Sequence, residues 1–263
     1  MNRRAFVCAI MLAGTGLGWG RPAFSQQMQS GTIVSDAADQ LLGLTNQVRA
    51  QSGSKRLEWD QGLAQAAQAH CLRMAAEGPI AHRYGGEADL STRAAQAGAR
   101  FDLIEENVAV GPSAEVVHDQ WMHSPGHRSN LMNPEVDRVG IAVVAARGVL
   151  YATADYARGV QPLSPDQVEA KVADLIRVSG VALLGDHALA RAACAMDRGL
   201  PGIKDEVRPG FIMRWQDSEL NQLPRQLADN LISGQYHKAA VGSCPAQGVE
   251  GDFTAYRVAV LLY

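Results

Sequence analysis

Two apolar runs separated by one turn signal are the feature that most constrains the fold of this chain. The runs lie at residues 138–145 and 149–156 and flank Arg147-Gly148, a pattern that predicts two antiparallel strands joined by a hairpin. Three amphipathic helical patterns precede the hairpin, at residues 37–53, 60–77 and 114–123. Helices followed by an antiparallel pair of strands predict an α+β sandwich, in which helices pack on a sheet.

The stretch between the second and third helical patterns has no long periodic run. Residues 78–111 contain Gly-Pro and Gly-Gly steps, which are typical of irregular backbone. Irregular segments of this length are uncommon in compact domains and tend to be functional. We therefore expect residues 78–111 to be mostly loop and to contribute to a site.

The second half of the chain resembles the first. Residues 57–69 and 183–195 are identical at seven of thirteen positions at a constant offset of 126, and residues 130–138 match 230–238 at an offset of 100. Two related domains explain both matches, whereas two alanine-rich helices that are alike by chance are the alternative. The smaller second offset predicts that the second copy is about 26 residues shorter around the region that matches 78–111.

A boundary between two domains follows from composition. Residues 161–167 contain two prolines and are typical of a linker. We therefore expect a first domain at residues 36–160 and a second, smaller α+β domain at residues 168–263. The second is a degenerate repeat of the first if the two matches are real.

The first 25 residues have the composition of an export signal. Residues 1–4 are positively charged, residues 5–20 are apolar but short for a bilayer span, and residues 23–25 are suited to cleavage. The pair Arg3-Arg4 also fits a twin-arginine signal, so that pathway and the ordinary secretory pathway both stay open. The alternative is a cytoplasmic protein with an apolar first helix. We expect an exported protein, either periplasmic or secreted.

The charge of the mature chain limits its partners. Removal of residues 1–25 leaves 21 basic and 27 acidic residues, a net charge of −6. A negative chain argues against nucleic acid or an anionic membrane surface as the main partner. No later apolar run is long enough for an integral membrane span.

Three cysteines remain after cleavage, and they cannot all pair within the chain. An oxidising compartment favours disulfides, so one pair and one free thiol are expected. Cys71 lies in the middle of a helical pattern, where a buried apolar role is the simplest. Cys194 and Cys244 are therefore the expected disulfide.

Three segments of the first half carry side chains suited to chemistry. They are AHRYGGE (81–87), EENVAVG (105–111) and WMHSPGHRSNLM (121–132). With the Asn46/Arg49 pair on the first helix and a strand that begins Val-Gly, their order resembles the CAP superfamily, which includes cysteine-rich secretory, antigen 5 and plant pathogenesis-related proteins. The resemblance covers residues 38–158 and is closest to short bacterial SCP-like members. It implies an α-β-α sandwich whose cleft holds two histidines and two acids.

Carried over by position, the resemblance implies a ligand cleft formed by His82, Glu87, Glu106 and His127. Two neutral imidazoles beside carboxylates suit zinc or another divalent metal. We expect His82 and His127 to be the metal ligands, with the acids either binding the metal or orienting the imidazoles. Each residue also has a structural alternative: an exposed loop position for His82, a turn cap for His127 and a surface carboxylate for Glu106.

Other polar residues in these segments are expected to have structural roles. His70, His118 and His123 are interpreted as structural or exposed, and Asn107 and Trp121 as fold-defining. Ser124 precedes a proline, and the sequence shows neither the strained elbow nor the oxyanion hole that a serine nucleophile needs. In the second half, Leu227 stands where the first half has His127, so the second domain is expected to lack this site and to serve packing or partner binding.

Two functions from different classes fit these residues. The first is a binding module whose cleft holds a metal and a ligand, which the resemblance implies to be a lipid, cell-envelope material or a protein. The second is a metal-dependent hydrolase, peptidase-like, in which Glu106 or Glu87 is the base and His127 a further catalytic residue. A third interpretation is that the His/Glu group only makes the loop rigid.

Overall fold

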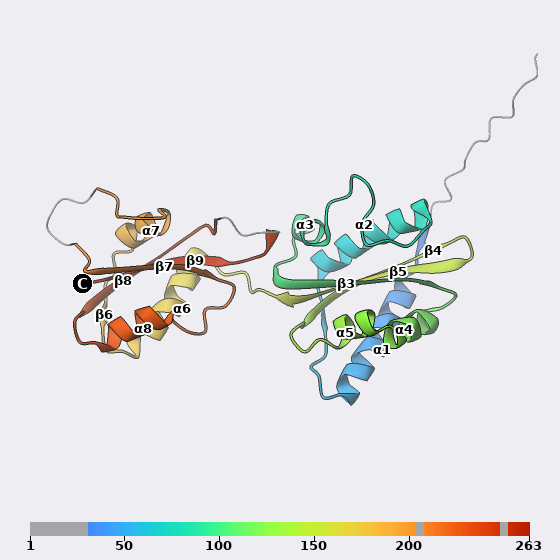
Figure 1. The fold of residues 1–263 in the computed structure, drawn as a ribbon, viewed down its shortest axis with the longest axis horizontal. Coiled ribbons are helices and arrows are strands. Elements are labelled where there is room, and N and C mark those ends of the chain that lie inside the picture. The colour runs from blue at the N-terminus through green and yellow to red at the C-terminus, as the bar shows by residue number, and fades with distance from the viewer. Residues whose placement is uncertain (1–30, 203–207, 248–251) are drawn as a thin grey trace, which may run out of the picture.

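The chain folds around two separate sheets, which form two lobes joined end to end (Figure 1). The computed structural model describes residues 31–202, 208–247 and 252–263. The expected export signal at residues 1–25 lies outside the described residues. None of the helices in the described ranges is long and apolar enough to cross a membrane.

The first lobe contains a five-stranded sheet with the order β1-β4-β5-β3, and β2 pairs in parallel with β4. Its strands are β1 (Thr32–Ile33), β2 (Glu58–Trp59), β3 (Phe101–Gly111), β4 (Arg138–Ala146) and β5 (Val149–Gly159). Its helices are α1 (Ser35–Gln51), α2 (Gln61–Glu77), α3 (Leu90–Gln96), α4 (Ala114–His123) and α5 (Pro125–Met132).

Helices cover both faces of this sheet. Figure 1 shows α2 and α3 on one face and α1, α4 and α5 on the other. Successive side chains of β4 point to opposite faces of the sheet, so the strand contributes to a hydrophobic core on each face. Ile141 and Val143 pack with Leu41 and Trp121 on one face. Ala142 packs beneath α2 on the other. The α+β class and the predicted α-β-α sandwich are therefore confirmed.

The predicted hairpin is present between β4 and β5. Ala146 pairs with Val149, and Arg147 and Gly148 have φ angles of 52° and 76°. Positive φ at both central residues is the geometry that matches the twist of two antiparallel strands.

The prediction that residues 78–111 are mostly loop was wrong for the second half of that range. Asp89 caps α3 by accepting a hydrogen bond from the backbone N–H of Thr92, and β3 pairs with β5 from Phe101 to Gly111. The acids of β3 interrupt its apolar pattern, so the pairing with β5 decides the structure. Likewise, the predicted Ser-Pro-Gly-His turn is the start of α5, with Pro125 in its first turn.

The second lobe contains a four-stranded sheet with the order β6-β8-β9-β7. Its strands are β6 (Ala182–Leu183), β7 (Phe211–Asp217), β8 (Lys238–Cys244) and β9 (Tyr256–Leu262). Its helices are α6 (Pro165–Arg177), α7 (Ala188–Cys194) and α8 (Arg225–Ile232). Helix α7 packs on one face, and α6 and α8 pack on the other (Figure 1).

The two lobes share an order of elements: helix, short strand, helix, strand, helix and a final antiparallel pair. In each lobe the short strand pairs in parallel with the first strand of that final pair. A glycine on that strand also meets the second helix in each lobe: a Cβ on Gly140 would lie 2.0 Å from the Ala64 nitrogen, and one on Gly242 2.1 Å from that of Arg191. These likenesses support the proposal that the second lobe is a degenerate repeat.

The cysteines adopt the expected arrangement. Cys194 and Cys244 form a disulfide with a Cα–Cα distance of 5.8 Å, which joins the end of α7 to the end of β8. Cys71 is buried and unpaired, and its thiol donates a hydrogen bond to the Tyr151 carbonyl. Burial raises the pKa of Cys71 to about 12, so its thiol is unreactive at neutral pH.

Candidate functional site

Glu106 is the centre of the polar group in the first lobe. It lies on β3, and its side chain is 3% exposed. One carboxylate oxygen accepts a hydrogen bond from His82 Nδ1 at 2.8 Å, and the other accepts one from Arg93 Nη2. A buried carboxylate needs such partners, because desolvation of an unpaired charge costs several kcal/mol.

His82 is held against Glu106 from the loop between α2 and α3. Its backbone carbonyl accepts a hydrogen bond from Arg93 Nη1 at 3.2 Å, while 60% of its side chain is exposed. An ionised carboxylate only accepts hydrogen bonds, so His82 Nδ1 carries the proton and Nε2 keeps a lone pair when the ring is neutral. The bond to Glu106 raises the pKa of His82.

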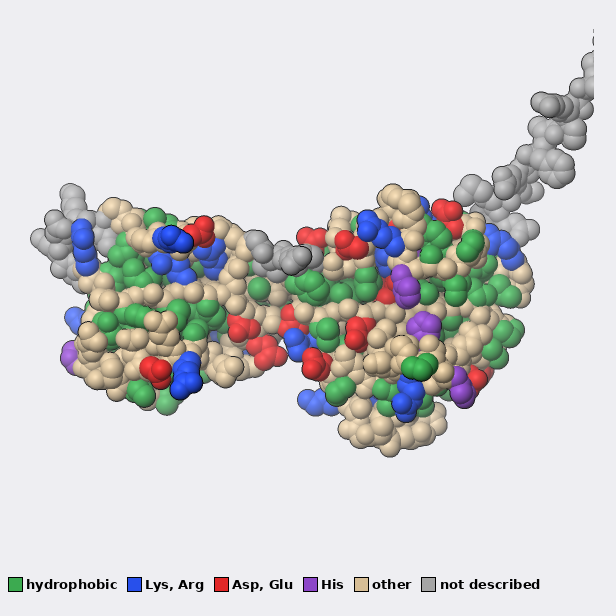
Figure 2. Space-filling model, in the orientation of Figure 1, with side chains coloured by type: hydrophobic (Ala, Val, Ile, Leu, Met, Phe, Trp, Pro, Cys, Tyr) green, Lys and Arg blue, Asp and Glu red, His purple; other side chains and the backbone are tan. Residues whose placement is uncertain are grey.

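His127 approaches the same place from the first turn of α5. Asn107 donates a hydrogen bond to its backbone carbonyl at 2.9 Å, and Asn130 donates to the Asn107 side chain at 3.0 Å. Burial, and then the charge of His82, lower the pKa of His127. Figure 2 shows histidine side chains at the surface of this lobe.

Glu87 faces α2 rather than the two imidazoles. Its carboxylate accepts hydrogen bonds from His70 Nδ1 at 2.8 Å and from the Tyr84 backbone at 2.9 Å. Burial alone would raise the pKa of Glu87, but these hydrogen bonds lower it overall. The structure thus places His82 against Glu106 and the His127 backbone against Asn107, the next residue on β3, whereas Glu87 is engaged by a residue that sequence reasoning treated as structural.

His70 connects the two acids. It is fully buried on α2, its Nε2 donates to the Ala81 carbonyl at 2.9 Å, and that nitrogen lies 4.0 Å from Glu106. Both direct partners of the ring can accept a hydrogen bond, so His70 bridges the Glu87 carboxylate and the Ala81 carbonyl. Arg93 supplies the guanidinium that contacts buried Glu106.

Asp155 is a further acid beneath the site. It pairs with Glu106 across β3 and β5, is fully buried, and its oxygens meet no donor among the described residues. Burial and the adjacent Glu106 charge raise its pKa well above the ordinary value, so Asp155 loses its proton less readily than an exposed carboxyl group does. The sequence signal for this residue is an acid inside an otherwise apolar strand. Arg93 had no such signal, because it lies in a segment that was expected to be irregular.

The remaining polar residues of these segments lie where structural roles predominate. His118 is buried on α4, and burial lowers its pKa. His123 is exposed and forms an ion pair with Asp119 at 3.2 Å, an acid partner that sequence reasoning missed. Trp121 is fully buried in the core beneath α1.

The donor set limits what metal chemistry is feasible. Within the described ranges, no group of three or more His, Cys, Asp or Glu side chains is arranged to hold a metal ion. A metal here would have imidazole nitrogens of exposed His82 and half-buried His127 as its protein ligands. Two neutral imidazoles suit zinc, with water or an external ligand at the other positions. Glu106 would orient His82 rather than bind the metal.

Residues 42–156 match the model of the CAP family, described as the cysteine-rich secretory protein family. The first lobe is a CAP domain. The segments that hold His82, Glu106 and His127 lie within the matched range. The expected bacterial CAP resemblance is therefore confirmed for this lobe.

Proteins similar to the CAP domain occur in Bacillus. The uncharacterized membrane protein YlbC of Bacillus subtilis (strain 168) is 31% identical over 115 residues, 42% of this chain and 32% of YlbC. The uncharacterized protein YkwD of the same organism is 30% identical over 120 residues, 44% of this chain and 46% of YkwD. The chain thus spans less than half the length of either relative.

A solved structure also matches this part of the chain. It belongs to an extracellular protein containing an SCP domain from Bacillus anthracis str. Ames, is 26% identical, and has a TM-score of 0.43. The match covers 47% of this chain and 41% of that chain.

Proposed function

We propose that this chain is an exported binding protein whose CAP domain holds a divalent metal, zinc in the first instance, between His82 and His127. The metal and the surrounding surface would bind an envelope or extracellular ligand: a lipid, cell-wall material or a protein. The observation that carries the proposal is the 2.8 Å bond from His82 Nδ1 to buried Glu106.

That bond prepares His82 for metal binding. A carboxylate that accepts the proton of one ring nitrogen fixes the tautomer and leaves the other nitrogen as a ligand. Arg93 holds Glu106 and the His82 backbone at once, so the imidazole is placed by two elements. The lowered pKa of His127 keeps the second imidazole neutral near pH 7.

The same contacts favour binding over hydrolysis. A general base needs a carboxylate or imidazole within reach of a water molecule and free to take its proton. Both oxygens of Glu106 are engaged by His82 and Arg93, and the carboxylate of Glu87 is engaged by His70 and Tyr84. The peptidase-like alternative therefore has less support than a binding site with modest, pH-dependent affinity.

Export is part of the proposal and rests on the first 25 residues, whose charged, apolar and small-residue regions follow one another in the order of a signal segment. The disulfide between Cys194 and Cys244 is in keeping with an oxidising compartment. Periplasmic and secreted locations remain the two alternatives.

Zinc titration by calorimetry tests the metal site. We expect saturable binding with one site per chain in the mature protein, and its loss in the His82→Ala/His127→Ala double variant. His123→Ala is the matched control, because His123 is exposed and pairs only with Asp119. Equal zinc binding by the double variant and the wild type would contradict the proposal, as would no binding by the wild type.

A further inference from the structure

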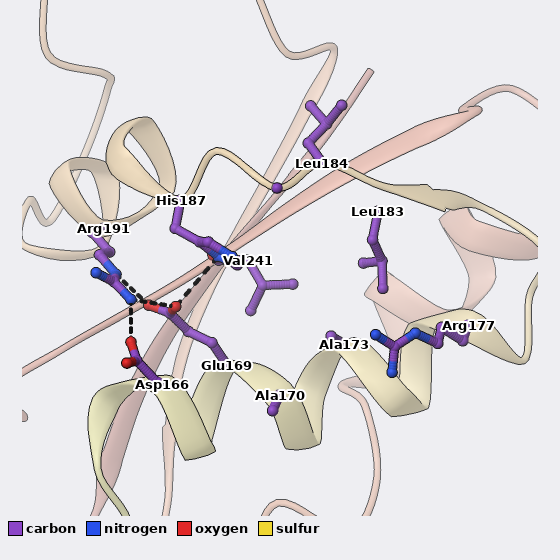
Figure 3. A pocket seen from close by; sticks show the side chains of 11 residues that line it. Asp166, Glu169, Ala170, Ala173, Arg177, Leu183, Leu184, His187, Arg191 and Val241 are labelled. Atoms are coloured by element: carbon purple, nitrogen blue, oxygen red, sulfur yellow. Dashed lines mark hydrogen bonds and ion pairs between the residues drawn. The ribbon is translucent and has the colours of Figure 1, made fainter.

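A cavity of about 580 Å³ lies in the second lobe, in a part of the chain that was expected to lack the histidine site and to serve packing or partner binding. It is bounded by α6, the end of β6, the start of α7 and β8 (Figure 3). Cavities of this size are within the range that holds small ligands in proteins. The His82–His127 site lies in the other lobe, so the cavity and that site are independent of each other.

One end of the cavity is a fixed polar cluster around Glu169. This carboxylate is 3% exposed and accepts hydrogen bonds from Arg191 Nε and Nη2 at 2.7 and 2.8 Å. Arg191 also contacts Asp166 at 2.5 Å, and His187 Nδ1 lies 3.3 Å from Glu169 (Figure 3). The cluster thus joins α6 to α7.

The cluster closes an open edge of the sheet. β6 pairs with β8 only at Lys238 and Ala239. Further along this edge, His187 Nδ1 donates to the Val241 carbonyl at 2.7 Å, and the Ser243 N–H donates to Glu169 at 2.8 Å. These side chains therefore form the hydrogen bonds that a neighbouring strand would otherwise form with the edge of the sheet. Because its carboxylate oxygens already accept these hydrogen bonds, Glu169 is not available to a ligand.

His187 and Arg177 retain groups that a ligand could contact. Both neighbours of His187 Nδ1 are acceptors, so Nδ1 carries a proton. Nε2, which meets no partner among the described residues, can accept a hydrogen bond when the ring is neutral. Arg177 lies at the opposite end of the cavity, and its one contact within the described residues is with exposed Asp174. Between the two ends, the lining is apolar and includes Ala170, Ala173 and Leu183 (Figure 3).

The charges of the two ends are opposite. One end of the cavity has two carboxylates, Asp166 and Glu169, and one guanidinium, Arg191, so its net charge is −1 when His187 is neutral. Arg177 supplies a positive charge at the other end. Glu169 and Arg177 are eight residues apart on α6, which corresponds to about 12 Å along the helix axis. An extended tripeptide spans about 10 Å, so its amine and carboxylate match the two ends.

We propose that this cavity binds a short apolar peptide, with its free carboxylate on Arg177 and its amine at His187. Small side chains fit the alanine-lined wall formed by α6. The pair of Arg177 with Asp174 competes with the ligand carboxylate, but both side chains are about two-thirds exposed, at 65% and 68%, and exposed pairs are weak.

Calorimetry of the mature chain with L-Ala-L-Ala-L-Ala tests the site. We expect saturable binding that weakens by about tenfold or more for the C-terminal amide of the peptide and for Arg177→Gln, since each removes one charged partner. Asp174→Asn should tighten binding, because it frees Arg177. An unchanged melting temperature of each variant shows that the lobe is intact.

Three results would overturn the proposal: no saturable binding of the peptide to the wild type, equal affinity for the peptide and its amide, or full affinity in Arg177→Gln. The His82→Ala/His127→Ala variant should bind the peptide as the wild type does. Its failure to do so would place the peptide in the first lobe and would also contradict the proposal.

Discussion

Asp155 stands directly opposite Glu106 in the pairing of β5 with β3, so two carboxyl groups from neighbouring strands lie side by side under the histidine site. Directly paired residues of antiparallel strands point to the same face of a sheet. Only one of the two can ionise at low cost in this buried place. Arg93 and His82 contact Glu106, whereas the Asp155 oxygens meet no donor among the described residues, and burial beside Glu106 raises the pKa of Asp155.

Asp155→Asn should therefore stabilise the protein at alkaline pH. The pKa of Asp155 is higher in the folded than in the unfolded state, so its protonated form favours folding at low pH, and that advantage is lost as pH rises from the unfolded value through the folded one. Each unit of the shift corresponds to about 1.4 kcal/mol. Denaturant unfolding at pH 4 and pH 8 should show a difference between variant and wild type that grows with pH. A variant that is less stable than the wild type at pH 8 would show that Asp155 is ionised or bonded.

Arg93→Met should destabilise the CAP domain by about 3–5 kcal/mol, because it leaves the Glu106 charge buried without its cation. The free energy of unfolding in urea measures this loss. Arg93→Met/Glu106→Gln should recover part of it, since the unpaired charge is then absent. A cost below about 1 kcal/mol for the single variant would mean that Glu106 is solvated or protonated.

Glu106→Gln should weaken zinc binding by about tenfold or more, the usual effect of removing the carboxylate that orients a metal-binding histidine. It should also lower the pKa of His82, whose largest cause of elevation is the bond to Glu106. NMR titration of the His82 ring measures the pKa, and calorimetry measures the affinity. Glu105→Gln is the matched control, because its neighbouring carboxylate binds Asn133 instead. Equal effects of the two variants would assign the change to net charge.

Periodicity and turn chemistry were sufficient to predict the elements that have a regular pattern. The β4–β5 hairpin follows from two apolar runs and the turn signal Arg147-Gly148, and α2 follows from its apolar face. β3 was missed because Glu105 and Glu106 interrupt its pattern, and only its pairing with β5 makes that segment extended.

The sequence likewise indicated some residues of the site and missed others. The resemblance to the CAP superfamily pointed to His82, Glu106 and His127; the structure places His82 against Glu106 and the His127 backbone against Asn107, the next residue on β3. The contributions of Arg93 and His70 were not predictable, because one arginine or histidine in a helix has no local pattern that indicates which acid it meets.

Gly140→Ala should be among the most destabilising small changes in the CAP domain. A Cβ at this position would lie 2.0 Å from the Ala64 nitrogen, so α2 must move away from the sheet that carries Glu106. Forcing extra atoms into a packed contact costs about 1–3 kcal/mol or more. Gly43→Ala is the control: it lies within α1 with open space around its Cβ, and should stabilise by about 0.5–1 kcal/mol. Thermal unfolding compares the two variants, and a Gly140→Ala melting temperature equal to that of the wild type would show that α2 does not approach β4 this closely.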